Sequence, residues 1–401
     1  MQPDVLISSP GGVVAVLAAV AAFWFAVEQA SGWKFFQYVP PLLFIYATPV
    51  FLNNLDVIPS ASPVYAGLSS FVLPVFIVLM LIKVDVPAAV RIMGKGVLVM
   101  LLGTLGVVVG AVVSYAIVHR WLDPDAWRGF GALAGSWIGG TGNMAATSEM
   151  LDTPPEQFGL AVLADNVIYI IWLPILLASK NFAEQFNRWA KVPEDRLRMM
   201  DRASAQVLEQ ERNPEMRDFI YLGAIAIGVT WISNQLAGAL FAWTESALPA
   251  LTGMLTESTW RILLITTIAL SLSVTRVSRL PAATPLGTAL IYVFVAGMGA
   301  RASIEGFGQA PAFLLGALIW IFVHGAFCLL GAKLFRVDVH SAAIASAANI
   351  GAAASAPIVA AFHRPSLVPV SVLMALIGYA LGNYVAPLAG HLARIAVGQP
   401  G

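Results

Sequence analysis

Residues 135–150 read GSWIGGTGNMAATSEM, and after the polar break LDTPPEQ the chain continues as FGLAVLADNVIYIIWLP at residues 158–174. The first segment is made almost wholly of small residues. Three glycines recur every fourth position, a spacing that lets another backbone approach closely: Gly131, Gly135 and Gly139. The run GGTGN at residues 139–143 cannot continue a stable helix in lipid, so its peptide groups need partners from protein, water or a ligand. The segment therefore predicts an interrupted helix.

The second segment has membrane length and carries Asp165 and Asn166 inside an apolar run. At a rise of ~1.5 Å per residue, Asp165 lies roughly 13 Å along the helix. That depth is close to the middle of a hydrocarbon core of ~30 Å. An ionisable residue at mid-depth beside broken backbone is typical of the substrate or ion site of a secondary transporter.

Composition indicates the broad class. Of 401 residues, 59% are hydrophobic and 11% are charged, whereas a soluble domain carries about 25% charge. We therefore expect a polytopic membrane protein. The net charge is zero, which gives no reason to expect a nucleic-acid partner, and the single cysteine, Cys328, excludes a disulfide framework. No basic residue precedes the first apolar run, so we expect a first span there and not a cleaved leader.

The order of apolar segments predicts two halves, residues 1–179 and 218–401, joined by a polar cytoplasmic linker at 180–217. Each half also contains one small-residue segment, at 130–150 and at 341–361. Ten membrane spans are expected, near residues 13–30, 38–53, 63–83, 96–118, 157–179, 218–241, 259–275, 284–300, 310–332 and 366–390.

The same order of six elements recurs in both halves. Matching GTGNMAATS (140–148) to AANIGAAAS (347–355) places Asn143 opposite Asn349, and matching the last spans places Tyr169 opposite Tyr379. If both small-residue segments dip into the membrane and return, nine Lys and Arg outside the linker are cytoplasmic and five are external. The positive-inside rule favours this arrangement, in which the halves are inverted. The alternative, twelve full crossings with parallel halves, stays open.

The candidate site combines the two small-residue segments with the helix of Asp165. Ion ligands are expected from carboxylate and amide oxygens and from one hydroxyl: Asp165, Asn166, Asn143, Thr141 and Glu149. Substrate contacts are expected from the interrupted backbone and nearby polar side chains: Gly140, Gly142, Asn143, Ser148, Asn349, Ser346 and Ser355. No metal site is expected because the five histidines form no i,i+3 or i,i+4 pair.

The segments GSWIGGTGNMAATSEM and LADNVIYIIWLP, with SAANIGAAASAPIV at residues 346–359, resemble the YjcL-like family of poorly characterised bacterial membrane proteins along essentially the whole chain. That family in turn resembles the superfamily of cation:proton antiporters and bile-acid:sodium symporters. The resemblance implies inverted repeats, a panel domain, and a core domain in which two interrupted segments cross. In the antiporters an Asp-Asp or Asn-Asp pair holds the ion. Asp165-Asn166 occupies that place in the reverse order, and Ala375 stands opposite Asp165, so a mechanism with two carboxylates is not supported.

Nucleotide-binding and hydrolase motifs such as GxxxxGK[ST], GxSxG and HExxH are missing from the sequence, so we expect neither an enzyme nor a cofactor. The leading hypothesis is a transporter of the inner membrane. It moves a small organic solute, an anion or an amphiphilic metabolite, by alternating access with Na⁺ or H⁺ as the coupling ion. The alternatives are a cation:proton antiporter and a membrane scaffold or sensor that transports nothing. Expected partners are the solute, the lipid bilayer and, as in similar folds, a second copy bound through the panel.

Overall fold

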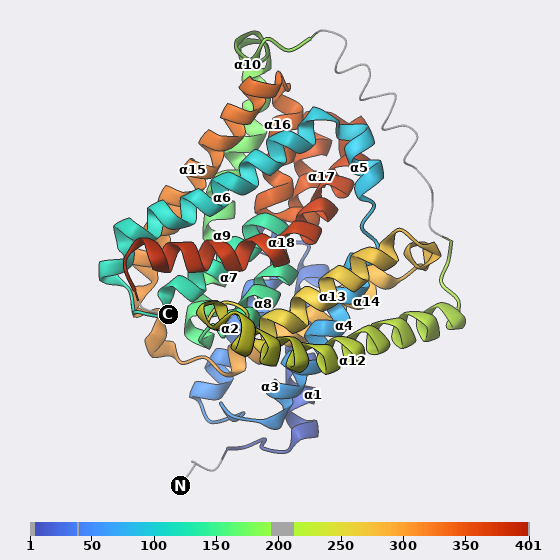
Figure 1. The fold of residues 1–401 in the computed structure, drawn as a ribbon, viewed down its shortest axis with the longest axis vertical. Coiled ribbons are helices and arrows are strands. Elements are labelled where there is room, and N and C mark those ends of the chain that lie inside the picture. The colour runs from blue at the N-terminus through green and yellow to red at the C-terminus, as the bar shows by residue number, and fades with distance from the viewer. Residues whose placement is uncertain (1–4, 38–39, 194–211, 400–401) are drawn as a thin grey trace.

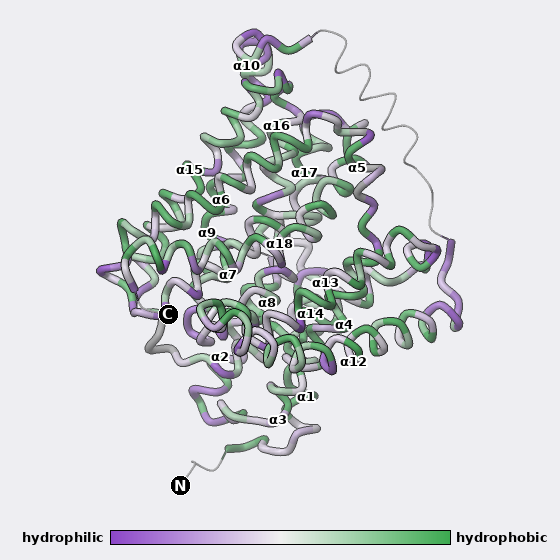
Figure 2. Tube along the Cα trace, in the orientation of Figure 1, coloured by the Kyte–Doolittle hydropathy of each residue, from purple (hydrophilic) through white to green (hydrophobic). Residues whose placement is uncertain are grey.

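The computed structural model describes residues 5–37, 40–193 and 212–399, and over these residues the regular structure is helical (Figure 1). Eight of the described helices are long and apolar enough to cross a membrane. Figure 2 shows hydrophobic residues along the helices and hydrophilic residues gathered at helix ends and connections. The predicted class, an all-helical polytopic membrane protein, is confirmed.

The first half contains five predicted spans and the first interrupted segment. Its helices are α1 (Pro10–Ser31), α2 (Pro41–Asn54), α3 (Pro63–Gly67), α4 (Leu73–Leu81), α5 (Val86–Met93), α6 (Lys95–Val118), α7 (Ala126–Gly139), α8 (Thr141–Met150) and α9 (Pro155–Ala178). A π-helical turn joins α3 to α4, so that these two helices form one span. Of the predicted linker, α10 (Ala183–Ala190) is described, and residues 194–211 lie outside the described residues.

The second half repeats this order. Its helices are α12 (Met216–Ala247), α13 (Glu257–Ser273), α14 (Ala283–Ala300), α15 (Ala310–Phe335), α16 (Val339–Ile350), α17 (Ala352–His363) and α18 (Val368–Ala396). The second expected span of each half is short: α2 has 14 residues and α13 has 17. At ~1.5 Å per residue these helices measure about 21 and 26 Å, less than the ~30 Å of a hydrocarbon core. This is why eight long spans are found where ten were expected.

Both small-residue segments fold as helical hairpins that turn back on themselves. In the first, a Cβ on Gly135 of α7 would lie 2.5 Å from the backbone oxygen of Asn143 in α8, and Gly131 packs against Leu151 farther along the returning arm. In the second, His340 at the start of α16 and His363 at the end of α17 approach to 3.0 Å between their Nδ1 atoms. Residues near the start and the end of each segment are therefore neighbours. This geometry is the one expected if each segment dips into the membrane and returns.

The described helices form two groups. The helices α1, α2, α4, α12, α13 and α14 pack mainly on one another, and we call this group the panel. The group of α6, α9, α15 and α18 with the two hairpins is called the core. Figure 1 shows the hairpin α16–α17 and α6 on the far side of the molecule from α1 and α12. Each half contributes corresponding helices to each group.

Aromatic side chains hold the core together where α6, α7 and α15 meet. Trp320 of α15 stacks on Phe130 with ring centroids 5.5 Å apart, and its centroid lies 4.8 Å from that of Trp137. The Trp320 indole also donates a hydrogen bond of 2.7 Å to the backbone oxygen of Val107 in α6. These contacts fix α7, and with it the position of Trp137.

The predicted correspondence between Asn143 and Asn349 is not reproduced. The first hairpin breaks at Gly140 and the second at Gly351, so Asn143 follows its break by three residues whereas Asn349 precedes its break by two. Helix α16 runs through Ala347–Ile350 because alanine and isoleucine continue a helix without difficulty. Matching small residues by composition therefore gave the wrong register.

Candidate functional site

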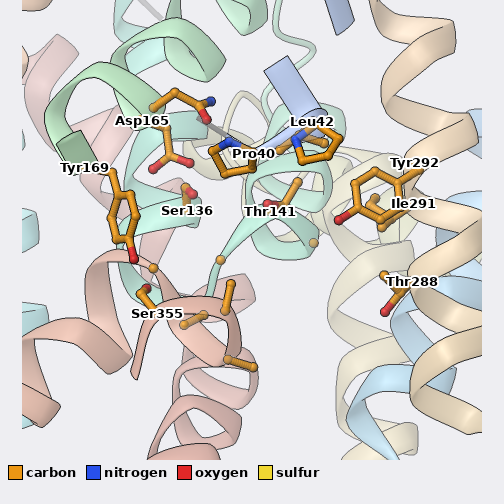
Figure 3. Close-up of a pocket in the computed structure, with 18 of the residues that line it drawn as sticks. Pro40, Leu42, Ser136, Thr141, Asp165, Tyr169, Thr288, Ile291, Tyr292 and Ser355 are labelled. Atoms are coloured by element: carbon orange, nitrogen blue, oxygen red, sulfur yellow. The ribbon is translucent and has the colours of Figure 1, made fainter. Parts of the chain in front are cut away.

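A cavity of about 450 Å³ lies between the panel and the core. Its core wall comes from the tips of both hairpins and from α9, and its panel wall comes from α1, α2, α4 and α14. Figure 3 shows Ser136, Asp165, Tyr169 and Ser355 on one side, with Thr288, Ile291 and Tyr292 facing them from the other. The cavity is thus built where the breaks of both hairpins meet the panel.

Asp165 is partly open to this cavity. Its Oδ1 accepts a hydrogen bond of 3.0 Å from the indole nitrogen of Trp137, and Ser136 lies beside the same carboxylate. The lining, over the described residues, contains no lysine, arginine or histidine. The carboxylate therefore has neutral hydrogen-bond donors and open space as neighbours, and a cation or proton can reach it.

Asn166 also lines the cavity, but its amide nitrogen is used within α9, where it donates to the backbone oxygen of Val162 at 2.7 Å. The amide oxygen is the remaining group with which Asn166 could bind a cation. Hence Asp165 and Asn166 can offer oxygen ligands from adjacent positions of one helix.

The two hairpin tips touch each other in the cavity wall. Gly140 has φ 82° and ψ −175°, a conformation found essentially only at glycine, and α8 begins at the next residue. A Cβ on Gly140 would lie 2.8 Å from the Cβ of Ala352, the first residue of α17. The N-termini of α8 and α17 therefore meet, and each presents backbone N–H groups that have no partner within its own helix. Four predicted site residues line this region: Gly140, Thr141, Gly142 and Ser355.

Two predicted asparagines point away from the cavity. The amide nitrogen of Asn143 donates to the backbone oxygen of Tyr379 at 3.0 Å and to Oδ1 of Asn383 at 2.8 Å, both in α18. Asn349 is buried against α6, where its side chain is 2.9 Å from the hydroxyl of Thr104. Both amides satisfy contacts between core helices and do not face the solute space.

The remaining three predictions also fall outside the cavity lining. Ser346 accepts a hydrogen bond of 3.0 Å from the indole of Trp172 and lies 3.0 Å from Nε2 of His324. Ser148 is buried within the first hairpin. Glu149 forms an ion pair of 2.9 Å with Arg261 of α13, because the end of α8 lies directly beside the panel. Glu149 thus contributes to the attachment of core to panel and does not join Asp165.

Polar contacts between core and panel concentrate on the two short helices. On α13, Arg261 holds Glu149, and the hydroxyl of Thr266 accepts a hydrogen bond of 2.9 Å from Asn383 of α18. On α2, the hydroxyl of Tyr46 donates to the backbone oxygen of Pro155, the first residue of α9, at 2.8 Å. The helices α2 and α13 are the second spans of the two halves, so each half attaches its panel to the core through the same element.

Sequence reasoning missed the panel side of the cavity. Glu28 of α1 lines it together with Phe25, Thr288 and Tyr292. A lone carboxylate inside an apolar span is the signal that identified Asp165, and the same signal was present at Glu28 in the first span. The role of Trp137 carried no such signal, because a tryptophan in a membrane segment is most often a packing residue. Among the described residues, no group of three or more His, Cys, Asp or Glu side chains could hold a metal ion.

Comparison with known proteins places the chain among membrane proteins. Residues 15–395 match the family described as "Protein of unknown function (DUF819)". The chain is also similar to "Uncharacterized membrane protein YjcL" of Bacillus subtilis strain 168, with 27% identity over 386 residues that cover 95% of each sequence. The resemblance to the YjcL-like family is thereby confirmed.

Proposed function

The chain belongs to the DUF819 family, and from that premise we propose that it is a secondary transporter that moves a small organic solute across the bacterial inner membrane with Na⁺ or H⁺. One observation carries the proposal. Asp165 and the tips of both hairpins line a single cavity between two separately packed groups of helices. Interrupted helices around a site at mid-depth are the usual construction of secondary transporters.

The backbone at the hairpin tips supplies a place for an anionic group. The N-terminus of an α-helix carries a partial positive charge of about half an elementary charge, and its first N–H groups are free to donate. Here the N-termini of α8 and α17 line the same cavity. A carboxylate or similar group of the solute would receive hydrogen bonds from both, without any basic side chain.

Asp165 supplies the place for the coupling ion. An isolated charge at this depth is costly unless it is paired or solvated, so a bound cation or a proton stabilises it. Trp137 donates a hydrogen bond to Oδ1 and Ser136 lies beside the same carboxylate, so an ion would share the carboxylate with these donors and could also use the amide oxygen of Asn166. Binding of the cation next to the hairpin tips would make the site more favourable for an anionic group of the solute.

The size of the cavity favours this function over a cation:proton antiporter. A volume of about 450 Å³ is within the range of sites for small organic molecules and far exceeds the space of a single cation. A scaffold or sensor that binds no solute has no need for such a cavity around an ionisable residue. In the proposed cycle the core moves against the panel, and the contacts of α2 and α13 with the core form in one state and break in the other.

The first test follows cation binding without knowledge of the solute. Because Trp137 donates to Asp165, cation binding should change the tryptophan fluorescence of the purified protein during a titration with Na⁺ or acid. We expect this change to disappear in Trp137→Phe and in Asp165→Asn. Glu184→Gln, which removes an exposed carboxylate on α10, should respond like the wild type.

The second test measures transport. Proteoliposomes are supplied with a defined mixture of small carboxylic and amino acids under an inward Na⁺ or pH gradient, and accumulated solutes are identified by mass spectrometry. We expect gradient-dependent accumulation with the wild type and with Glu184→Gln, and none with Asp165→Asn. If neither gradient drives accumulation of any solute, transport is rejected. If cations also leave the fluorescence unchanged, Asp165 is not the site of a coupling ion.

A further inference from the structure

The charges around the cavity do not balance for an anionic solute. Two carboxylates line it, Asp165 on the core wall and Glu28 on the panel wall, and the described lining contains no basic side chain. The two helix N-termini contribute together about one positive charge. With one coupling cation at Asp165 and no solute, the net charge around the cavity would be close to zero. A bound solute anion would make that net charge negative. A positive charge carried by the solute itself would restore the balance.

Glu28 lies in an aromatic environment on the panel. Phe25 precedes it by three residues and therefore shares its face of α1. The ring of Phe25 meets that of Tyr292 edge to face, with centroids 4.8 Å apart and planes at 80°. Thr288 precedes Tyr292 by one turn of α14 and also lines the cavity. A carboxylate beside aromatic rings and a hydroxyl is the chemistry that binds an ammonium group, including a quaternary one.

We infer that the solute is a zwitterion whose cationic amine binds to the panel wall at Glu28, Phe25 and Tyr292 while its anionic group binds to the hairpin tips; this inference rests on the proposed transport function. The negative charge that the sequence analysis expected on the solute is then carried by one end of a zwitterion. A zwitterion touches both walls at once, because the tips belong to the core and Glu28 belongs to the panel. The solute would then link the two groups of helices across the cavity.

Two pairs of probes of equal shape test the charge requirement. Glycine betaine carries a trimethylammonium group where 3,3-dimethylbutanoate carries an uncharged tert-butyl group of the same shape. Choline and 3,3-dimethylbutanol differ in the same way. Affinity is measured by calorimetry on the purified protein in detergent with Na⁺ present. We expect glycine betaine to bind at least about tenfold more tightly than 3,3-dimethylbutanoate, which corresponds to about 1.4 kcal/mol. Choline should likewise bind more tightly than 3,3-dimethylbutanol.

Variants assign the effect to the panel wall. Glu28→Gln should abolish both preferences for nitrogen, and Tyr292→Leu should reduce them several-fold. Tyr292→Phe keeps the ring and should keep the preference. Glu245→Gln, an exposed carboxylate on α12, serves as the matched control. Retention of the cation-dependent fluorescence of Trp137 shows that each variant is folded.

Three outcomes would overturn the inference: equal binding of each pair by the wild type, an unchanged preference in Glu28→Gln, or no binding of either quaternary probe. Because these measurements use no gradient, they can fail while gradient-driven uptake of another solute succeeds. In that case the proposed function stands and the zwitterion assignment falls. The reverse result, discrimination without uptake, would retain the binding site and reject transport.

Discussion

Contact between the hairpin tips can be tested with one methyl group added and another removed. Gly140→Ala places a side chain on backbone at φ 82° and ψ −175°, which costs about 1–3 kcal/mol for a residue other than glycine. The new Cβ would also lie 2.8 Å from the Cβ of Ala352, whereas carbon atoms in contact are separated by ~3.5–4.0 Å. Overpacking of this kind costs about 1–3 kcal/mol more. We expect a total loss of ~2–6 kcal/mol in the free energy of unfolding.

Ala352→Gly separates the two contributions. Ala352 has φ 47°, so glycine removes backbone strain of about 1–2 kcal/mol and loses a buried methyl group worth ~0.8 kcal/mol. The single variant should therefore be close to neutral. In this background Gly140→Ala keeps its backbone cost but has no methyl group to meet. The double-mutant cycle should show a coupling of about 1–3 kcal/mol.

The free energies come from unfolding in mixed micelles with increasing SDS, followed by tryptophan fluorescence. Gly228→Ala on α12 is the control, because its Cβ would meet no atom within 4 Å and should change stability by less than ~1 kcal/mol. If the effects of Gly140→Ala and Ala352→Gly add to within about 0.5 kcal/mol, the two tips do not touch and the described contact between Gly140 and Ala352 is wrong.

Three further variants, each with a control variant, test packing and the attachment of core to panel. Gly299→Ala should destabilise the panel by about 1–3 kcal/mol in the same assay, because its Cβ would meet the backbone oxygen of Tyr46. The control Gly287→Ala should cost less, because its Cβ would meet the flexible side chain of Met80 at 3.3 Å. Equal effects would contradict this packing. Glu149→Gln should cost about 1–2 kcal/mol of stability, since its partner Arg261 is 14% exposed. The control Asp125→Asn should cost less than ~1 kcal/mol, because Asp125 is 55% exposed. The reverse order would rule out the Glu149–Arg261 ion pair as an attachment of core to panel. Tyr46→Phe should cost about 0.5–1.5 kcal/mol through the hydrogen bond to Pro155, and Tyr221→Phe on the exposed face of α12 should cost nothing; no difference between them would exclude that bond.

The sequence was most informative where a chemical requirement of the membrane is local. The run at residues 139–143 predicted an interruption of the helix, and the structure breaks it at Gly140, between α7 and α8. The spacing of Gly131, Gly135 and Gly139 predicted close approach of another backbone, and α8 with α18 provides it. Asp165 was recognisable because a carboxylate in an apolar span is costly. These inferences need no knowledge of distant contacts.

The sequence was least informative where the partner comes from another part of the chain. Asn143 and Glu149 are polar groups beside the break, yet their contacts with α18 and α13 direct them away from the cavity. Nothing local distinguishes an asparagine that binds a solute from one that joins two helices. The position of Gly351 within an alanine-rich run was equally undetermined, because every residue around it tolerates a helix.

The depth of Asp165 has an electrical consequence. Asp165 is the eleventh residue of the 24-residue helix α9, so an ion that reaches it from one face of the membrane crosses roughly half of the transmembrane potential. Moving one elementary charge through the whole of 100 mV is worth ~2.3 kcal/mol, and half of that path is worth about 1 kcal/mol. If the proposed coupling ion binds at Asp165, its affinity should therefore change about fivefold per 100 mV, so that the membrane voltage would act on occupancy of the site as directly as the ion concentration does.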